Sequence, residues 1–360
     1  MSVDLVVVHC PVGGGHKAAA FAVAESAKAR GLSVEIVDAF AHAPKWAGDA
    51  YLQAHLTGQN VLPDFYGEMF FAANHRGPLD PVRLRWDSVI FRGLRDRIDE
   101  LAPQAIVATH HLPLVVLGRE RRKKRLDAPV LGVVTDYIAH ACWAERGVDA
   151  WAVPTERTAR EMIEHGASED AVIVTGIPVR QAFERIAPVL PRRNGELAVL
   201  VTSGGFGVGP MERIVESFRW IDGIDLTVVC GSAKKIAAPE GVRATILGFE
   251  KDMPARIARA DVVVGKAGGL TVTETLTAGR PMVIASAVPG NEAVNAAFVT
   301  SGGAGVCAEP ADVGAMIARL RSLGALGAMG KNARALVPTG AAAAVVGAAM
   351  ALASRARAAA

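Results

Sequence analysis

Short aliphatic runs alternate along this chain with longer stretches in which apolar residues recur every three or four positions. Runs bounded by glycine or polar residues are typical of central strands of a parallel sheet, and the longer stretches are typical of the helices that cover it. Strands are predicted at 5–10, 34–37, 105–108, 130–134 and 172–175, and again at 198–202, 226–230, 245–247 and 262–264. This repeated strand, turn and helix pattern predicts an α/β fold with doubly wound sheets.

The length of the chain predicts two domains. With 360 residues, of which 51% are hydrophobic, the chain can form two ordinary cores. The stretch 188–196, rich in proline, arginine and glycine, is typical of a linker. We therefore predict a first domain at 1–187 and a second at 197–340, followed by an alanine-rich helix within 341–360.

The stretch 261–306 contains the strongest candidate ligand site. Gly268 and Gly269 lack side chains, so their backbone amides can approach a ligand, and the helix that starts near Thr271 directs its positive end to the same point. This arrangement suits a diphosphate without a metal. Glu274, one turn further on, is placed to accept hydrogen bonds from ribose hydroxyls, or is simply a solvated helical residue.

Two more loops of the second half carry groups for the same ligand. Asn291 and Glu292 precede another helix, with Asn295 one turn on, and polar side chains at the carboxyl ends of parallel strands suit sugar hydroxyls. Another turn, which again lets backbone approach phosphate, contains Ser203, Gly204 and Gly205.

The glycine turn near the start allows a second interpretation. Gly13, Gly15 and Ala18 satisfy G-x-G-x-x-A, and Asp38 follows about twenty residues later, as in dinucleotide-binding folds. His16, which follows Gly15 directly, is atypical of that motif. The better nucleotide site in the second half also argues against a dinucleotide here.

Polar residues follow two strands of the first half. His110 and His111 are adjacent, but two histidines without a third partner do not predict a metal site. Asp136 and Tyr137 stand at the end of the strand at 130–134, where a carboxylate faces the ligand-binding edge of a parallel sheet.

Aromatic and basic residues are concentrated at 42–95, and a basic run lies at 119–125. Aromatic side chains beside cations suit an interface with anionic lipid headgroups. The alternatives are helices that pack their aromatic residues into the core, and a basic helix end that is merely solvated. The aromatic residues are Trp46, Tyr51, Phe65, Tyr66, Phe70, Phe71, Trp86 and Phe91.

Five motifs in order resemble the monogalactosyldiacylglycerol synthase and processive diacylglycerol glucosyltransferase family, which is related to the N-acetylglucosaminyltransferase of peptidoglycan precursors. The motifs are GGGHKAAA, VTDYIAHACW with TGIPVR, SGGFG, LGFEKDMP, and KAGGLTVTETLTAGRP followed by PGNEAVN. The sequence departs from the family in having PGNE where PGQE is common, and AGGL where AGPG is frequent. The shorter Asn291 leaves glucose and galactose equally open.

The resemblance implies a GT-B fold, in which two Rossmann-like domains face a central cleft and the final helix, at 341–360, packs on the first domain. It implies an inverting transfer of a hexose from a UDP-sugar to a lipid hydroxyl, without cofactor or metal. His16 would be the general base or would position the acceptor, with Asp136 as the other candidate base, although a histidine that only caps the turn is also possible. Gly14, Gly15, Tyr137 and His140 would lie near the acceptor, and Phe249 would contact uracil unless it belongs to the core.

Composition limits the remaining functions. A net charge of +3 is too small to indicate nucleic acid as a partner. The four cysteines are scattered, which predicts buried thiols in a reducing cytosol. No apolar run of about 18 residues is evident, so we expect peripheral attachment to the cytoplasmic face of the membrane. The rivals are a transferase for another lipid-linked or hydrophobic acceptor, and a NAD-binding or non-enzymatic protein.

Overall fold

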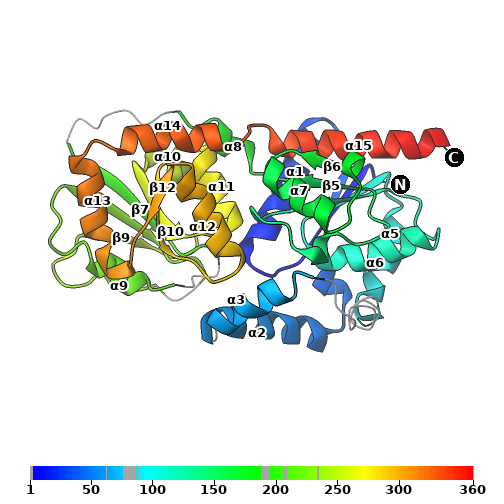
Figure 1. Cartoon of the computed structure of the whole chain (residues 1–360), viewed down its shortest axis with the longest axis horizontal. Helices are drawn as coiled ribbons and strands as arrows, with labels where there is room; N and C mark the ends of the chain where they lie inside the picture. The colour runs from blue at the N-terminus through cyan, green and yellow to red at the C-terminus, as the bar shows by residue number, and fades with distance from the viewer. Residues whose placement is uncertain are drawn as a thin grey trace. The chain divides into compact units, whose positions relative to one another are not determined.

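The computed structural model describes residues 3–61, 63–75, 86, 89–187, 195–205, 209–232 and 235–359. These residues form two compact units, one of Met1–Gln181 with Gly340–Ala360 and the other of Ala182–Thr339 (Figure 1). The predicted linker at 188–196 lies mostly outside the described residues.

The first unit is built on a six-stranded parallel sheet with strand order β2-β1-β3-β4-β5-β6. Its central strands are wholly buried because helices cover both faces, which explains their uninterrupted aliphatic sequences. The strands are β1 (Leu5–His9), β2 (Val34–Asp38), β3 (Ala105–Ala108), β4 (Val130–Val133), β5 (Ala150–Val153) and β6 (Val172–Val174). The α-helices are α1 (Gly14–Ala29), α2 (Lys45–Val61), α3 (Pro63–Ala72), α5 (Arg92–Leu101), α6 (His111–Arg122), α7 (Glu156–Glu164), α8 (Gln181–Glu184, which reaches the second unit) and α15 (Ala341–Ala359).

The second unit contains another six-stranded parallel sheet, ordered β12-β11-β10-β7-β8-β9. Its strands are β7 (Leu197–Thr202), β8 (Ile224–Val229), β9 (Ala244–Leu247), β10 (Val262–Lys266), β11 (Met282–Ser286) and β12 (Gly305–Cys307). Its helices are α9 (Met211–Glu216), α10 (Met253–Arg259), α11 (Gly269–Thr277), α12 (Asn291–Ser301), α13 (Val313–Ser322) and α14 (Leu326–Leu336). Short 3-10 helices lie at Ala39–His42, Ala141–Trp143, Glu169–Ala171 and Pro310–Asp312.

Each sheet has one point at which the strand order reverses. In the first sheet this point lies between β1 and β3, and in the second between β7 and β10. Ligands of open α/β sheets bind beyond the carboxyl ends of the strands at such a point, because the connections on either side diverge there. We therefore expect ligands to bind at the turns that follow these four strands.

The C-terminal helix belongs to the first unit. Val345, Val346, Ala349 and Ala353 of α15 are buried in one core cluster with Leu5 and other residues of the sheet. Figure 1 shows α15 lying along α1, and Arg30 donates a hydrogen bond to the carbonyl of Ala343 at 2.9 Å. The small alanine side chains of both helices allow this close approach.

Among the described residues, the stretch Leu326–Ala358 contains an 18-residue window that is long and apolar enough to cross a membrane by length and composition, and the mean hydropathy of that window is 1.9. The expectation that no such run exists was wrong, because alanines contribute much of the hydropathy of this stretch. The segment is divided into α14 and α15, and α15 buries one face against the first sheet, as core helices of soluble domains do.

The boundary between the units differs from the predicted one. It falls at 181/182 rather than 187/188, because the carbonyls that follow α8 are bound by arginines of the second unit. Arg334 donates to the carbonyls of Glu184 and Ile186 at 2.7 and 2.9 Å. Arg280, only 2% exposed, donates to the carbonyl of Ala187.

The cysteines also differ in part from expectation. Cys10 and Cys230 are buried, whereas Cys142 is partly buried and Cys307 is exposed at the end of the edge strand β12. None of the four forms a disulfide in the part of the chain that the structure describes. An edge strand has solvent on one side, so a side chain there need not be buried.

Candidate active site

His16 lies in the first turn of α1, beside the point where the first sheet reverses its order. The helix begins at Gly14 because Gly13, with a φ of 75°, adopts a left-handed conformation that other residues rarely reach. Gly14 is exposed and Gly15 half-buried, so the turn leaves backbone accessible beside His16.

The ring of His16 is held by the ends of two other strands. Its Nδ1 lies 2.7 Å from the carbonyl oxygen of Thr109, after β3, and 3.0 Å from Oγ1 of Thr135, after β4. A carbonyl oxygen can only accept a hydrogen bond, so the proton of the neutral ring is on Nδ1. The neutral imidazole therefore has its lone pair on Nε2, which is the form that a general base requires.

Electrostatics keep this ring in the basic form at neutral pH. Burial lowers the pKa of His16 below 6.5, and His9 acts in the same direction, whereas Asp136 and the hydrogen bond to Thr109 act to raise it. The burial effect is the largest, since a charged imidazolium is costly away from water. His16 is thus uncharged at pH 7 and close to the carboxylate that would stabilise its charged form.

A row of rings extends from His16. Its ring meets that of His110 edge-on, with centroids 4.5 Å apart, and His110 stacks on His111 at 4.3 Å. His111 in turn contacts Trp143 at 6.0 Å. Among the described residues, no group of three or more His, Cys, Asp or Glu side chains is arranged to hold a metal ion.

Two of the predicted acceptor residues have evident structural roles. His140 donates from Nε2 to the carbonyl of Phe70 at 2.9 Å, and its Nδ1 accepts from the amide of Cys142 at 3.2 Å. Nε2 of His140 thus attaches α3 to this loop, and Nδ1 caps the short 3-10 helix at Ala141–Trp143. Tyr137 is 3% exposed, so it lies within the domain rather than on its surface, and Asp136 is half-buried.

In the second unit, the turn after β10 brings several predicted residues together. Gly268 caps α11, and a side chain at this position would meet Oε1 of Glu292 at 3.9 Å. That carboxylate is 6% exposed and uses both oxygens, one in an ion pair with Lys266 at 3.1 Å and one to accept from the amide of Val288 at 2.9 Å. Glu292 therefore shapes the loop before α12, and Lys266 is a site residue that the sequence analysis missed.

The two asparagines of α12 differ in their roles. Asn295 is fully buried and donates from Nδ2 to the carbonyl of Ala267 at 2.9 Å, which fixes the glycine turn. Asn291 stands at the first position of α12, and its Oδ1 is buried without a hydrogen-bond partner among the described residues. A buried acceptor without a partner is costly, so this oxygen is a candidate for a ligand hydroxyl.

The remaining predicted donor residues follow the strands β7, β9 and β10 of the second sheet. Thr271 and Glu274 are half-buried on α11, whereas Ser203 is 4% exposed at the end of β7. Gly204 has a φ of 71°, and Ser232 donates through its hydroxyl to the carbonyl of Gly205 at 2.8 Å. Phe249 is 65% exposed, so it does not belong to the core. Residues 206–208 of the SGGFG motif lie outside the described residues.

The aromatic residues of the segment 42–95 divide into buried and exposed ones. Phe91 is 4% exposed in the core and Tyr51 packs against Phe40, as the alternative interpretation predicted. Four large apolar side chains on α2 and α3 are instead exposed, and we call them the exposed apolar residues. They are Trp46 (61%), Phe65 (58%), Met69 (51%) and Phe71 (48%). Arg76, Arg83 and Arg85 of this segment lie outside the described residues.

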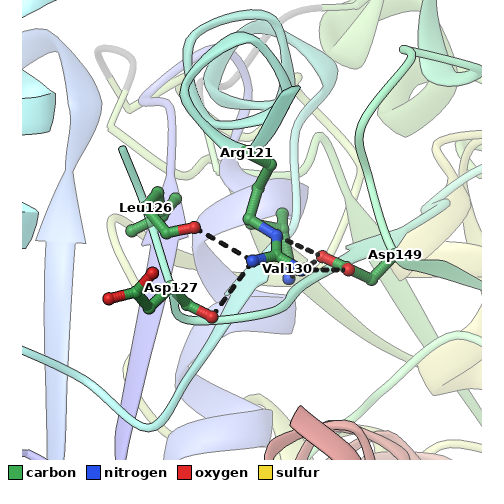
Figure 2. Close-up of polar contacts among 5 residues, drawn as sticks. All are labelled: Arg121, Leu126, Asp127, Val130 and Asp149. Carbon is green, nitrogen blue, oxygen red and sulfur yellow. Dashed lines mark hydrogen bonds and ion pairs between the residues drawn. The ribbon is translucent and has the colours of Figure 1, made fainter. Parts of the chain in front are cut away.

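Two arginines of the basic run at 119–125 form ion pairs, although positions 122–125 are exposed. Arg121 forms a bidentate ion pair with Asp149 and donates to the carbonyls of Leu126 and Asp127 (Figure 2). Arg122 is paired with Glu145 at 2.7 Å. The nearby cavity of about 430 Å³ lies at the amino ends of β4 and β5, so it is separate from the site around His16.

Comparison with known proteins agrees with this arrangement. The family described as monogalactosyldiacylglycerol (MGDG) synthase matches residues 16–179, and the glycosyltransferase family 28 C-terminal domain matches residues 199–317. Residues 16–179 are thus similar to the synthase family, and residues 199–317 to the glycosyltransferase domain. A processive diacylglycerol beta-glucosyltransferase of Bacillus subtilis (strain 168) is 30% identical to this chain over 227 residues. That match covers 59% of this chain and 59% of the relative, so the chain spans about three fifths of the relative's length.

Solved structures identify the fold of this chain as GT-B. MurG of Acinetobacter baumannii superposes with a TM-score of 0.65 at 19% identity, covering 96% of this chain and 99% of that one. MnaA of S. aureus, solved with UDP, gives a TM-score of 0.58 at 12% identity, with 94% of each chain covered. The two parallel six-stranded sheets with flanking helices are the Rossmann-like domains predicted from the sequence.

Proposed function

We propose that this protein is an inverting glycosyltransferase that moves galactose or glucose from a UDP-hexose to the hydroxyl of a diacylglycerol-type lipid at the cytoplasmic membrane surface. One observation carries the proposal: the match to the MGDG synthase family begins at His16, and the ring of this residue is held with Nε2 as its basic nitrogen. The name of the Bacillus subtilis relative supports diacylglycerol as the acceptor class.

In the proposed reaction, Nε2 of His16 takes the proton of the lipid hydroxyl. The hydroxyl oxygen forms a bond to the anomeric carbon while the bond from that carbon to the diphosphate breaks, and UDP leaves with the electron pair. Attack from the side opposite UDP inverts the configuration. The Asp136 carboxylate stabilises the resulting imidazolium, in line with its favourable effect on the charged form of His16.

The donor is assigned to the second unit. The start of α11 at Gly268 and Gly269 would hold the diphosphate through backbone amides and the helix dipole, so no metal ion is needed to compensate its charge. Glu274 would bind the ribose, the exposed Phe249 would lie against uracil, and Asn291 would accept from a hydroxyl of the hexose. The bound UDP of the structurally similar MnaA supports a uridine nucleotide as ligand.

Membrane attachment is assigned to the exposed apolar residues. Trp46, Phe65, Met69 and Phe71 are exposed on two helices that contact each other, and large aromatic residues favour the level of the lipid headgroups. His140 joins α3 to the loop that carries Asp136, so a bilayer bound at α3 would lie beside the proposed acceptor residues. We therefore propose peripheral attachment, without a membrane-spanning helix.

The test is a transfer assay with radiolabelled UDP-glucose and UDP-galactose in separate reactions, each with diacylglycerol in phosphatidylglycerol-containing vesicles. We expect labelled glycosyl diacylglycerol from at least one donor. Transfer only to another hydrophobic acceptor would refute diacylglycerol as substrate. Thermal stabilisation by NAD, with none by UDP, would refute the transferase function as a whole.

A further inference from the structure

Two oxygen atoms of the described residues lie within hydrogen-bonding distance of His16 Nδ1. The carbonyl oxygen of Thr109 lies at 2.7 Å and Oγ1 of Thr135 at 3.0 Å. Both threonines are buried, at 0% and 3% exposure, at the carboxyl ends of β3 and β4. In the serine protease arrangement a carboxylate holds the second nitrogen of the catalytic histidine, and here two neutral oxygens occupy that place.

We propose that Thr135 is a positioning residue for His16, and that its hydroxyl, together with the Thr109 carbonyl, fixes the Nδ1-protonated tautomer and stabilises the imidazolium formed during transfer. This inference rests on the proposed function, because it assumes that Nε2 of His16 receives the acceptor's proton. It assigns to Thr135 a role beyond its position in the sequence motif VTDY.

The Thr109 carbonyl alone makes the opposite tautomer unfavourable. With the proton on Nε2, the lone pair of Nδ1 would face a carbonyl oxygen at 2.7 Å, and two acceptors would repel each other. Thr109 is itself fixed, since its hydroxyl contacts the carbonyls of His16 and Val8 at 2.8 and 3.4 Å. One residue therefore orients both the backbone and the ring of His16.

The Thr135 hydroxyl adds an acceptor that matters most after proton transfer. When Nε2 gains a proton, Nδ1–H becomes a charged donor, and hydrogen bonds to charged groups are stronger than those to neutral ones. The Thr135 oxygen thus stabilises the product of the proton transfer more than the neutral ring. The titratable groups that also act on His16 are Asp136 and His9, and the ring of His110 contacts it directly.

The experiment compares Thr135→Val, which keeps the shape and removes the hydroxyl, with Thr135→Ser, which keeps the hydroxyl. Thr158→Val is the matched control, because Thr158 is an equally buried threonine of the same unit whose hydroxyl bonds to Thr155 at 2.9 Å, in α7 and its cap. Three quantities are measured on the full-length protein: turnover with saturating donor as a function of pH, UDP affinity, and the imidazole ¹⁵N shifts of His16.

For Thr135→Val we expect turnover about 10- to 100-fold below the parent, the fold-change of one lost hydrogen bond to a charged group, with UDP affinity unchanged. The acid limb of the pH profile should move to lower pH, because the charged ring has lost an acceptor. Thr135→Ser should restore the turnover and the acid limb of the parent, and Thr158→Val should leave turnover and acid limb unaltered. If Thr135→Val does not fold, Thr135→Ala supplies the same readouts.

The parent protein gives an independent result. At pH 8 we expect His16 Nδ1 to show the ¹⁵N shift of a protonated nitrogen and Nε2 that of an unprotonated one. The reverse assignment would overturn the inference, as would a Thr135→Val protein with the turnover and acid limb of the parent. If His16→Ala keeps full turnover while the ¹⁵N shifts are as expected, the proposed base is wrong but the fixed tautomer is not.

Discussion

Asn291 offers the sharpest test of how the hexose is recognised. Its Oδ1 is buried without a hydrogen-bond partner among the described residues, beside the loop that Glu292 holds through Lys266 and Val288. Leaving such an acceptor unpaired costs about 1–3 kcal/mol, and a hydroxyl of bound hexose would recover that free energy. Asn291→Ala should therefore weaken UDP-hexose binding by roughly 5- to 150-fold.

The same change should leave the affinity for UDP alone within about twofold, because UDP lacks the hexose and would be held at α11, outside this contact. Since the substitution removes an unpaired buried group, the unliganded protein should not lose stability. Calorimetric titration with UDP and with UDP-hexose separates the two effects. Equal losses for both ligands, or no loss for either, would refute the assignment of this oxygen to the hexose.

Three further predictions follow from the described side chains. Glu274→Ala should lower UDP affinity by roughly 10- to 100-fold, as loss of a charge-assisted hydrogen bond does. EDTA should not alter UDP binding. Calorimetry measures both effects, and loss of binding in EDTA would contradict the metal-free site. Burial lowers the pKa of His9 and His16 below 6.5, so the unfolded chain binds more protons than the folded chain as the pH falls below that value. The melting temperature should therefore decrease from pH 7.5 to pH 5.5, and His9→Gln should reduce this pH dependence. Replacing Trp46 and Phe65 by serine should weaken sedimentation with anionic vesicles, whereas the same double change at the exposed Trp220 and Leu323 of the second unit should not.

The sequence predicted the strands well where they are buried on both faces. The runs at 105–108 and 262–264 are uninterrupted aliphatic segments, and both are strands, as expected where a strand is buried between two helical layers. The short strand β5, Ala150–Val153, was not predicted, since four residues containing a tryptophan have no clear periodicity. Helix α14 was missed because its glycines lower its helical propensity, although Gly330 allows close packing against Gly279.

The site could be predicted only as far as residue types indicate chemistry. The glycine turns at 13–15 and 268–269 and the position of His16 follow from sequence, because glycines that come directly after an aliphatic run indicate a turn between strand and helix. The pairing of Lys266 with Glu292 and the contacts of Thr109 and Thr135 with His16 depend on strands far apart in the chain. No local pattern predicts such contacts, and the same limit applies to the ion pairs of Arg121 with Asp149 and of Arg122 with Glu145.

The role of His16 is tested most directly by measuring turnover and UDP affinity side by side in His16→Ala, with Asp136→Asn as the comparison. Loss of a general base lowers rate by about 10²–10⁴-fold without affecting binding of a ligand that it does not contact. We predict that fall in hexose transfer to diacylglycerol for His16→Ala, with UDP affinity equal to that of the parent. Turnover within about threefold of the parent would contradict the account, and a large loss confined to Asp136→Asn would identify that carboxylate as the base.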